Sequence, residues 1–254
     1  MTMANLIAAL ALPANTRVDQ RVPKKLLLEN GAPTSADKRN IQDGIEEMFW
    51  LASLKPSNIG VAEFITAERE YLEIAVVSAC FRPQAKAVRL IELIHRAIPY
   101  PVVLVSEQAG ELTLSLAHKR LSQAEAGKGV LESSPVVVSL SGELASQPEK
   151  DFIASLLLAS QPAANLFTLY QGWQDRISDL FTARITGSFT VSATTAVAEA
   201  KCAALAEYTA LKQEIAALRA QAEKETQLSR RVDLNLQLQR MHGRLAQVKD
   251  CLGK

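Results

Sequence analysis

The chain has 254 residues, a length that fits one large domain or two small ones. Hydrophobic residues make up 48% of it and charged residues 22%, so it can bury a sizeable core like an ordinary globular protein. Its 28 lysines and arginines nearly balance 27 aspartates and glutamates, and the net charge of +1 excludes a strong global attraction to nucleic acid or anionic membranes. Any basic surface must therefore be local.

Cysteine usage and hydropathy indicate the compartment. Cys80, Cys202 and Cys251 are far apart and form no CxxC pair, which favours a reducing environment. The apolar opening segment 1–14 contains no lysine or arginine, unlike a secretory signal. The longest apolar run elsewhere, residues 152–159, is much shorter than the roughly 20 residues of a membrane helix. We therefore expect a cytoplasmic protein without a transmembrane segment.

Residues 1–40 predict a short helix followed by a basic connection, Val22-Pro23-Lys24-Lys25. Lys24 and Lys25, beside the rigid proline, are candidate contacts for a phosphate or another anion. A solvated surface loop is the alternative interpretation of the two lysines.

Residues 41–140 predict an α/β core. Apolar or β-branched runs indicate strands at residues 45–54, 71–78, 102–106 and 136–140, and the alternating leucines at 112–116 form a hairpin with the run before them. A helix is predicted from Pro83 to Ile98, because Val88, Ile91 and Ile94 recur at helical spacing.

Lys119 and Arg120 are predicted to close the second strand of that hairpin. Together with His118 they are candidate contacts for an anionic partner. An ordinary charged strand end is the alternative.

Residues 145–190 change to a helical pattern whose aromatic residues are expected in the core. Residues 193–252 contain no proline and predict one long helix or a helical pair. Apolar side chains there alternate spacings of three and four, as in a coiled coil. We take six of them as candidate interface residues: Leu211, Ile215, Leu218, Leu238, Met241 and Leu245.

The coiled-coil pattern changes phase between Glu225, Leu228 and Val232. The change indicates local overwinding or a bend near Arg230 and Arg231, the densest basic point of the arm and a further candidate for nucleic-acid contact. The seam requires cover, which a second copy, a partner protein or an intramolecular antiparallel hairpin would provide.

Motifs for catalysis are missing. The sequence lacks GxGxxG, GxxxxGK[ST], GxSxG and HExxH, and its three histidines are isolated from one another and from cysteine. A restriction-type nuclease needs an acid followed two residues later by lysine within a strand, and Glu73 is followed by Ile74 and Ala75. We therefore predict no catalytic residue, no metal ligand and no cofactor.

Three stretches together carry a family resemblance: Arg21-Val22-Pro23-Lys24-Lys25, the run from Ile91 to Val102 with its Ile-Pro-Tyr-Pro junction, and Arg230-Arg231-Val232-Asp233-Leu234-Asn235. In this order and spacing the chain resembles the bacterial family called domain of unknown function 4391. The resemblance implies a companion of large helicases and DNA methyltransferases in restriction-type anti-phage gene clusters. It implies no catalytic residue.

We expect an α+β protein with a small mixed-sheet domain at residues 1–145, a helical connector at 146–192 and a coiled-coil-like arm at 193–254. The expected function is a non-enzymatic accessory or scaffold subunit that docks on a helicase or methyltransferase, with self-association through the arm as a further possibility. The alternatives are a divergent metal-dependent nuclease subunit and a DNA-binding adaptor.

Overall fold

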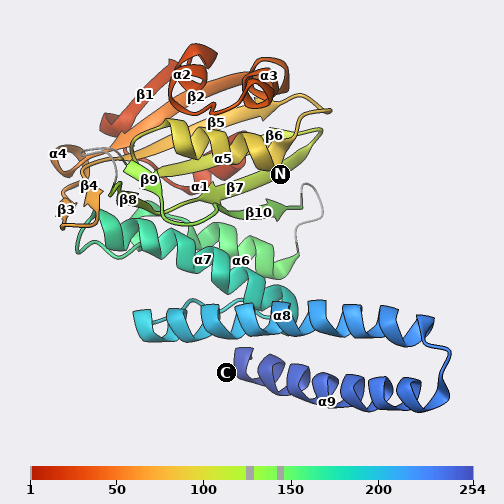
Figure 1. Cartoon of the computed structure of the whole chain (residues 1–254). Coiled ribbons are helices and arrows are strands. Elements are labelled where there is room, and N and C mark those ends of the chain that lie inside the picture. Colours follow the sequence, from red (N-terminus) through yellow and green to blue (C-terminus); the bar gives the residue numbers. More distant parts are fainter. Residues whose placement is uncertain (1, 124–128, 142–145, 254) are drawn as a thin grey trace. The chain divides into compact units, whose positions relative to one another are not determined.

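A computed structural model describes residues 2–123, 129–141 and 146–253 (Figure 1). The chain divides into two compact units, Met1–Gln174 and Asp175–Lys254, which we call the sheet unit and the hairpin unit. The residues of the expected connector, 146–192, are shared between both units and do not form a third one. The boundary expected at residue 145 falls in the segment 142–145, outside the described residues.

The sheet unit is built on one mixed sheet of six strands. Their order in the sheet is β1-β2-β5-β6-β7-β10, and β5 and β6 are parallel while all other neighbours are antiparallel. The α+β class and the expected hairpin are therefore confirmed. The strands are β1 (Arg17–Arg21), β2 (Ile45–Leu54), β5 (Ile74–Phe81), β6 (Val102–Gln108), β7 (Glu111–Leu116) and β10 (Val136–Leu140).

Helix α5 (Ala87–Ala97) connects the two parallel strands and covers one face of the sheet together with α2 (Lys24–Asn30) and α3 (Ser35–Gly44), as Figure 1 shows. Ile91 and Ile94 are buried in the core between these helices and the sheet, as predicted. Val88 is the exception, with 79% of its surface exposed. The predicted start at Pro83 is wrong, because Pro83 lies in the turn before the helix.

Two small sheets lie outside the main sheet. One pairs β3 (Phe64–Ile65) with β4 (Glu70–Tyr71), and the other pairs β8 (Lys119–Leu121) with β9 (Gly129–Leu131). The strand expected at residues 71–78 is therefore split, since β5 begins only at Ile74. Lys119 and Arg120 belong to β8, and the hairpin strand β7 ends at Leu116.

The remaining elements of the sheet unit are α1 (Met3–Ala9), η1 (Ala14–Thr16), α4 (Pro56–Ile59), α6 (Gln147–Ser155), η2 (Leu158–Ser160) and the first part of α7 (Leu166–Thr186). The expected aromatic core is confirmed, because Phe152, Tyr170 and Trp173 are fully buried. Tyr170 Oη donates to Val102 O over 2.7 Å, and Trp173 Nε1 donates to Leu156 O over 2.9 Å. These bonds satisfy the polar ends of two buried aromatic side chains.

The hairpin unit contains the end of α7 followed by α8 (Thr195–Lys224) and α9 (Leu228–Leu252). The two long helices lie side by side and run in opposite directions (Figure 1). They are joined at residues 225–227, so the bend lies just before the predicted position at Arg230 and Arg231. In the described residues, no helix is both long and apolar enough to cross a membrane.

Candidate functional site

The predicted interface residues lie along the seam where α8 and α9 pack on each other. Ile215 is buried, with 4% of its surface exposed, and the other five residues are half-buried. Two polar contacts cross the hairpin, from Arg219 Nη2 to His242 Nε2 at 2.9 Å and from Arg244 Nε to Glu207 Oε1 at 2.7 Å. Of the arrangements expected for the seam, the structure has the intramolecular hairpin, in which each helix covers the apolar residues of the other.

A second line of apolar residues on α9 has no such cover. Leu228, Val232 and Leu236 are exposed by 66%, 49% and 49%, and their spacing of four residues places them on one side of the helix. Leu234 and Leu238, on the seam, lie on the opposite side by the same helical geometry. We call Leu228, Val232 and Leu236 the apolar row.

The phase change in the sequence explains the apolar row. After the turn, the spacings of four and three resume at Leu234 and continue through Leu238, Met241 and Leu245, which are the residues that meet α8. Leu228 and Val232 keep a different phase and point elsewhere. The sequence thus carries two apolar lines on α9, of which the hairpin uses one.

A groove of about 590 Å³ lies between α7 and α8 within the hairpin unit. Phe181, Ile185, Leu205 and Tyr208 form its apolar lining. Lys212 lies at its rim, with its ammonium 5.9 Å from the centre of the Tyr208 ring. The groove is therefore an apolar surface with a cation at its rim.

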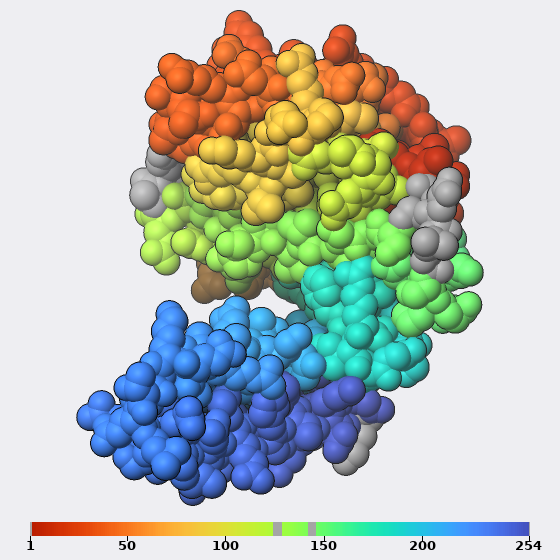
Figure 2. All heavy atoms as spheres, turned by 90° about the vertical axis from the view of Figure 1, so that its right-hand side faces the viewer, coloured from red at the N-terminus to blue at the C-terminus, as the bar shows by residue number. Residues whose placement is uncertain are grey.

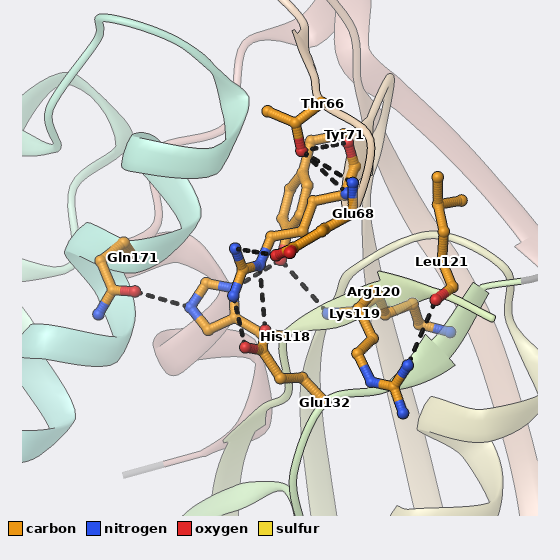
Figure 3. A network of polar contacts seen from close by, with 10 residues as sticks. Thr66, Glu68, Tyr71, His118, Lys119, Arg120, Leu121, Glu132 and Gln171 are labelled. Atoms are coloured by element: carbon orange, nitrogen blue, oxygen red, sulfur yellow. Dashed lines mark hydrogen bonds and ion pairs between the residues drawn. The ribbon is translucent and has the colours of Figure 1, made fainter. Parts of the chain in front are cut away.

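The sheet unit contains a polar network, drawn in Figure 3, where the two small sheets meet α7. Tyr71 Oη lies 2.5 Å from His118 Nδ1, and His118 Nε2 lies 2.8 Å from Gln171 Oε1. Because a carbonyl oxygen only accepts, Nε2 of His118 donates to Gln171 and Nδ1 accepts the Tyr71 hydroxyl proton. Arg69 adds a two-bond ion pair with Glu132, at 2.5 and 3.2 Å.

The electrostatics of this network keep its centre uncharged near neutral pH. Burial raises the pKa of Tyr71 above its usual range and lowers the pKa of His118 below its usual value. A tyrosine with a raised pKa is a poor acid, and the neutral histidine already uses both ring nitrogens. The network is therefore suited to fastening β4 and β8 to α7 rather than to proton transfer.

Lys119 corrects an expectation from the sequence. It is buried, with 3% of its surface exposed, and its ammonium donates to Ile98 O. Burial lowers the pKa of Lys119 to about 8. It therefore presents no charge at the surface to an anionic partner, and of the predicted pair only Arg120 is exposed.

The other predicted basic contacts lie in separate places. Lys24 is half-buried at the start of α2 and donates to Gln42 O over 2.8 Å, while Lys25 is exposed and lies 3.6 Å from Glu29. Arg230 and Arg231 are exposed in the first turns of α9, in the other unit. The predicted cations therefore do not form one shared site.

Glu73, the acidic residue considered for nuclease chemistry, is engaged in internal contacts. Glu73 is buried, accepts a bond of 2.5 Å from Ser53 Oγ and lies 3.1 Å from Lys55 Nζ. Among the residues that the structure describes, no group of three or more histidine, cysteine, aspartate or glutamate side chains is arranged to hold a metal ion.

Comparison with known proteins identifies a family. The sequence matches the family Domain of unknown function (DUF4391) over residues 10–245, a range that includes all three stretches on which the resemblance was based. No curated protein and no solved structure shows a significant match. Since the match spans most of the sequence, the chain belongs to the DUF4391 family.

Proposed function

We propose that this protein is a non-enzymatic accessory subunit of a bacterial restriction-type anti-phage system, and that its hairpin unit docks on the helicase or DNA methyltransferase of that system. The observation that carries this proposal is the apolar row Leu228, Val232 and Leu236. The resemblance of the sequence supports the choice of partner.

The energetic argument concerns what the apolar row would gain from a partner. Burying a leucine- or valine-sized side chain contributes about 1.5–3 kcal/mol when it starts fully exposed, and roughly half of that for side chains that are half exposed. Three such residues on one side of a helix match the recognition of an amphipathic helix face by an apolar surface, in which a few side chains supply most of the binding energy.

The test is co-purification with a restriction-type helicase or DNA methyltransferase from the same genome. We expect the wild-type chain to form a stable complex and the double variant Val232→Glu/Leu236→Glu to lose at least a hundredfold in affinity, measured by calorimetry. Both positions are about half exposed, so the variant should remain folded.

The matched control is Gln237→Glu/Gln247→Glu, which adds the same charge at two exposed positions of α9 outside the apolar row. It should bind like the wild type. Equal loss of affinity in both variants would show that the added negative charge, and not the loss of the apolar row, weakens binding. Undiminished binding by the Val232/Leu236 variant would reject the docking role of the row.

A further inference from the structure

A cleft of about 480 Å³ lies in the sheet unit where β5 ends and the turn to α5 begins. Arg39 of α3 lies on one side, and Arg82 and Lys86 of the turn lie on the other. Figure 2 faces this end of the unit, where gold atoms of the segment after β5 lie between orange atoms of the elements that precede it. Three cations from two distant segments thus share one cavity.

The three cations are available for a ligand. Arg39, Arg82 and Lys86 are exposed, and within residues 2–123, 129–141 and 146–253 none of them forms an ion pair. This contrasts with Arg89 on the adjacent helix, which is bound to Asp37 at 2.8 Å and to Glu92 at 2.6 Å. The fold neutralises a neighbouring arginine internally and leaves these cations facing the cleft.

The positive charge continues beyond the cleft. Arg21 and Lys24 line an adjoining cavity of about 350 Å³ between β2 and the start of α2. Burial lowers the pKa of the Lys24 ammonium, and the guanidinium groups of Arg82 and Arg21 also lower it, while the Asp43 carboxylate acts in the opposite direction. Lys24 Nζ also donates to Gln42 O, next to the cleft residue Asp43, over 2.8 Å. Since Asp43 and Gly44 line the cleft and the next residues, Ile45 and Glu46, line the second cavity, the two cavities adjoin and the positive charge extends across both.

The turn that presents Arg82 is held by a specific contact. Gln108, the last residue of β6, places its side-chain Nε2 within 3.2 Å of the carbonyl oxygens of Arg82, Pro83 and Ala85. The backbone of Arg82 also donates to Gly44 O over 2.8 Å. A cation on a fixed backbone loses less conformational freedom on binding than one on a free loop.

We propose that the cations Arg21, Lys24, Arg39, Arg82 and Lys86 bind successive phosphates of a nucleic-acid backbone. Cations spread across two adjoining cavities fit a repeating polyanion better than a single phosphate ion, because they can meet separate charges. The carboxylates of Asp43, Glu46 and Glu47 line the same cavities and limit the net attraction, so we expect weak binding that depends strongly on salt. This inference goes beyond partner docking and does not depend on it.

The test measures fluorescence anisotropy of a labelled 20-base-pair DNA duplex titrated with the full chain at 50 and 200 mM salt. We compare the wild type with Arg39→Ala/Arg82→Ala. Both side chains are exposed, and among the described residues neither forms a side-chain hydrogen bond or an ion pair. Since each lost phosphate contact reduces the salt slope by about 1, we expect the double variant to lose about 2 in slope and at least tenfold in affinity at 50 mM.

The matched control is Arg96→Ala/Lys150→Ala, which removes two exposed cations of the same unit that line neither cavity. It should retain most of the affinity. Equal weakening by both variants, or no binding by the wild type at 50 mM salt, would overturn the proposal. Displacement of the DNA by equimolar pyrophosphate would overturn it in favour of a small-anion site.

A second control separates this inference from the docking proposal. The variants Val232→Glu/Leu236→Glu and Gln237→Glu/Gln247→Glu carry the same added charge. They should therefore bind DNA with affinities within twofold of each other. Loss of DNA binding in the apolar-row variant alone would place the nucleic-acid contact on α9 and contradict the cleft.

Discussion

The sheet unit and the hairpin unit bury their apolar residues to different depths. On one face of the sheet, a continuous cluster of buried side chains fills the space to α2, α3 and α5. In α8 and α9, only Ala198, Ile215, Ala222, Val248 and Leu252 are buried, and most seam residues are half-buried. The sheet unit therefore has many positions where one polar substitution is destructive, whereas the hairpin has few.

Both tryptophans, Trp50 and Trp173, lie in the sheet unit. Tryptophan fluorescence therefore follows that unit, while far-UV circular dichroism follows the helices of both units. The two signals allow each prediction below to be assigned to one side of the comparison.

The largest effect is expected from Ile94→Asp in the sheet unit. Ile94 is fully buried in α5, and a buried unpaired carboxylate costs several kcal/mol, comparable with a whole domain stability of about 5–15 kcal/mol. The tryptophan emission should shift to that of an unfolded chain. Val88→Asp, on the same helix but 79% exposed, is the control and should unfold at the wild-type temperature. A folded Ile94→Asp protein would refute the packing of α5.

The second effect concerns an ion pair within the hairpin unit. Asp179 of α7 is 1% exposed, lies 2.9 Å from Lys201 Nζ of α8, and accepts bonds from the backbone nitrogen and hydroxyl of Ser192. Asp179→Ala leaves the Lys201 ammonium without its partner, and removing one member of a buried pair costs about 3–5 kcal/mol. Helical signal should be lost at lower urea concentration. The exposed Asp250→Ala is the control, and an unchanged urea midpoint would contradict the anchoring role.

A smaller effect is expected from Leu211→Glu/Leu218→Glu in the seam. Both residues are half-buried, so each replacement should cost about 0.8–1.5 kcal/mol, half of the value for full burial. The helical signal should melt earlier while tryptophan fluorescence keeps its midpoint. The wild type should scatter light as a monomer, since α9 covers the seam within one chain. A dimer that the double variant dissociates would show that a second copy covers it instead.

The mildest effect is a pH dependence of the sheet unit. Burial lowers the pKa of His95 to about 3, and the nearby Lys119 adds to the shift. Below pH 6.5 the unfolded chain binds a proton that the folded chain does not, so stability is lost as the pH falls from 6.5 toward 3, by about 1.4 kcal/mol per unit. Between pH 7 and 5, the loss should be about 2 kcal/mol, measured by urea unfolding.

His95→Gln keeps a donor for Ser115 Oγ, which lies 3.0 Å from His95 Nε2, and removes the titrating group. It should flatten the loss between pH 7 and 5, leaving the smaller part from His118, whose pKa is also lowered by burial. His242→Gln, in the hairpin unit, is the control, because tryptophan fluorescence does not follow that unit. An unaltered slope in His95→Gln would show that His95 is charged in the folded protein.

Local patterns predicted the elements that carry their own signal. Alternation at residues 112–116 and the apolar run at 45–54 identified β7 and β2, and the three-and-four spacing identified the hairpin seam. Strand β1 was missed because its sequence, RVDQR, is polar and lies at a sheet edge. The strand predicted at 71–78 begins too early. Glu73, which pairs with Lys55, interrupts it, and β5 begins at the next residue, Ile74.

The candidate sites were less predictable because they depend on contacts between distant segments. The burial of Lys119 requires the carbonyl of Ile98, 21 residues away, and no local pattern signals it. The cleft cations Arg39 and Arg82 lie 43 positions apart in the sequence and meet only through the packing of α3 against the turn after β5. The phase change before Leu234 indicated two lines of apolar residues on α9. Only the position of the turn showed which of these lines faces α8.

Strand β1 also has a consequence for solubility. An open sheet edge offers unpaired backbone groups to the strands of other molecules, and charged side chains and bulges hinder such pairing. In β1 the register with β2 shifts between Arg17 and Gln20, and Asp19 within that bulge has a φ of +50°. With Arg17, Asp19 and Arg21 exposed along it, this edge is both bent and charged, and it is protected against edge-to-edge aggregation.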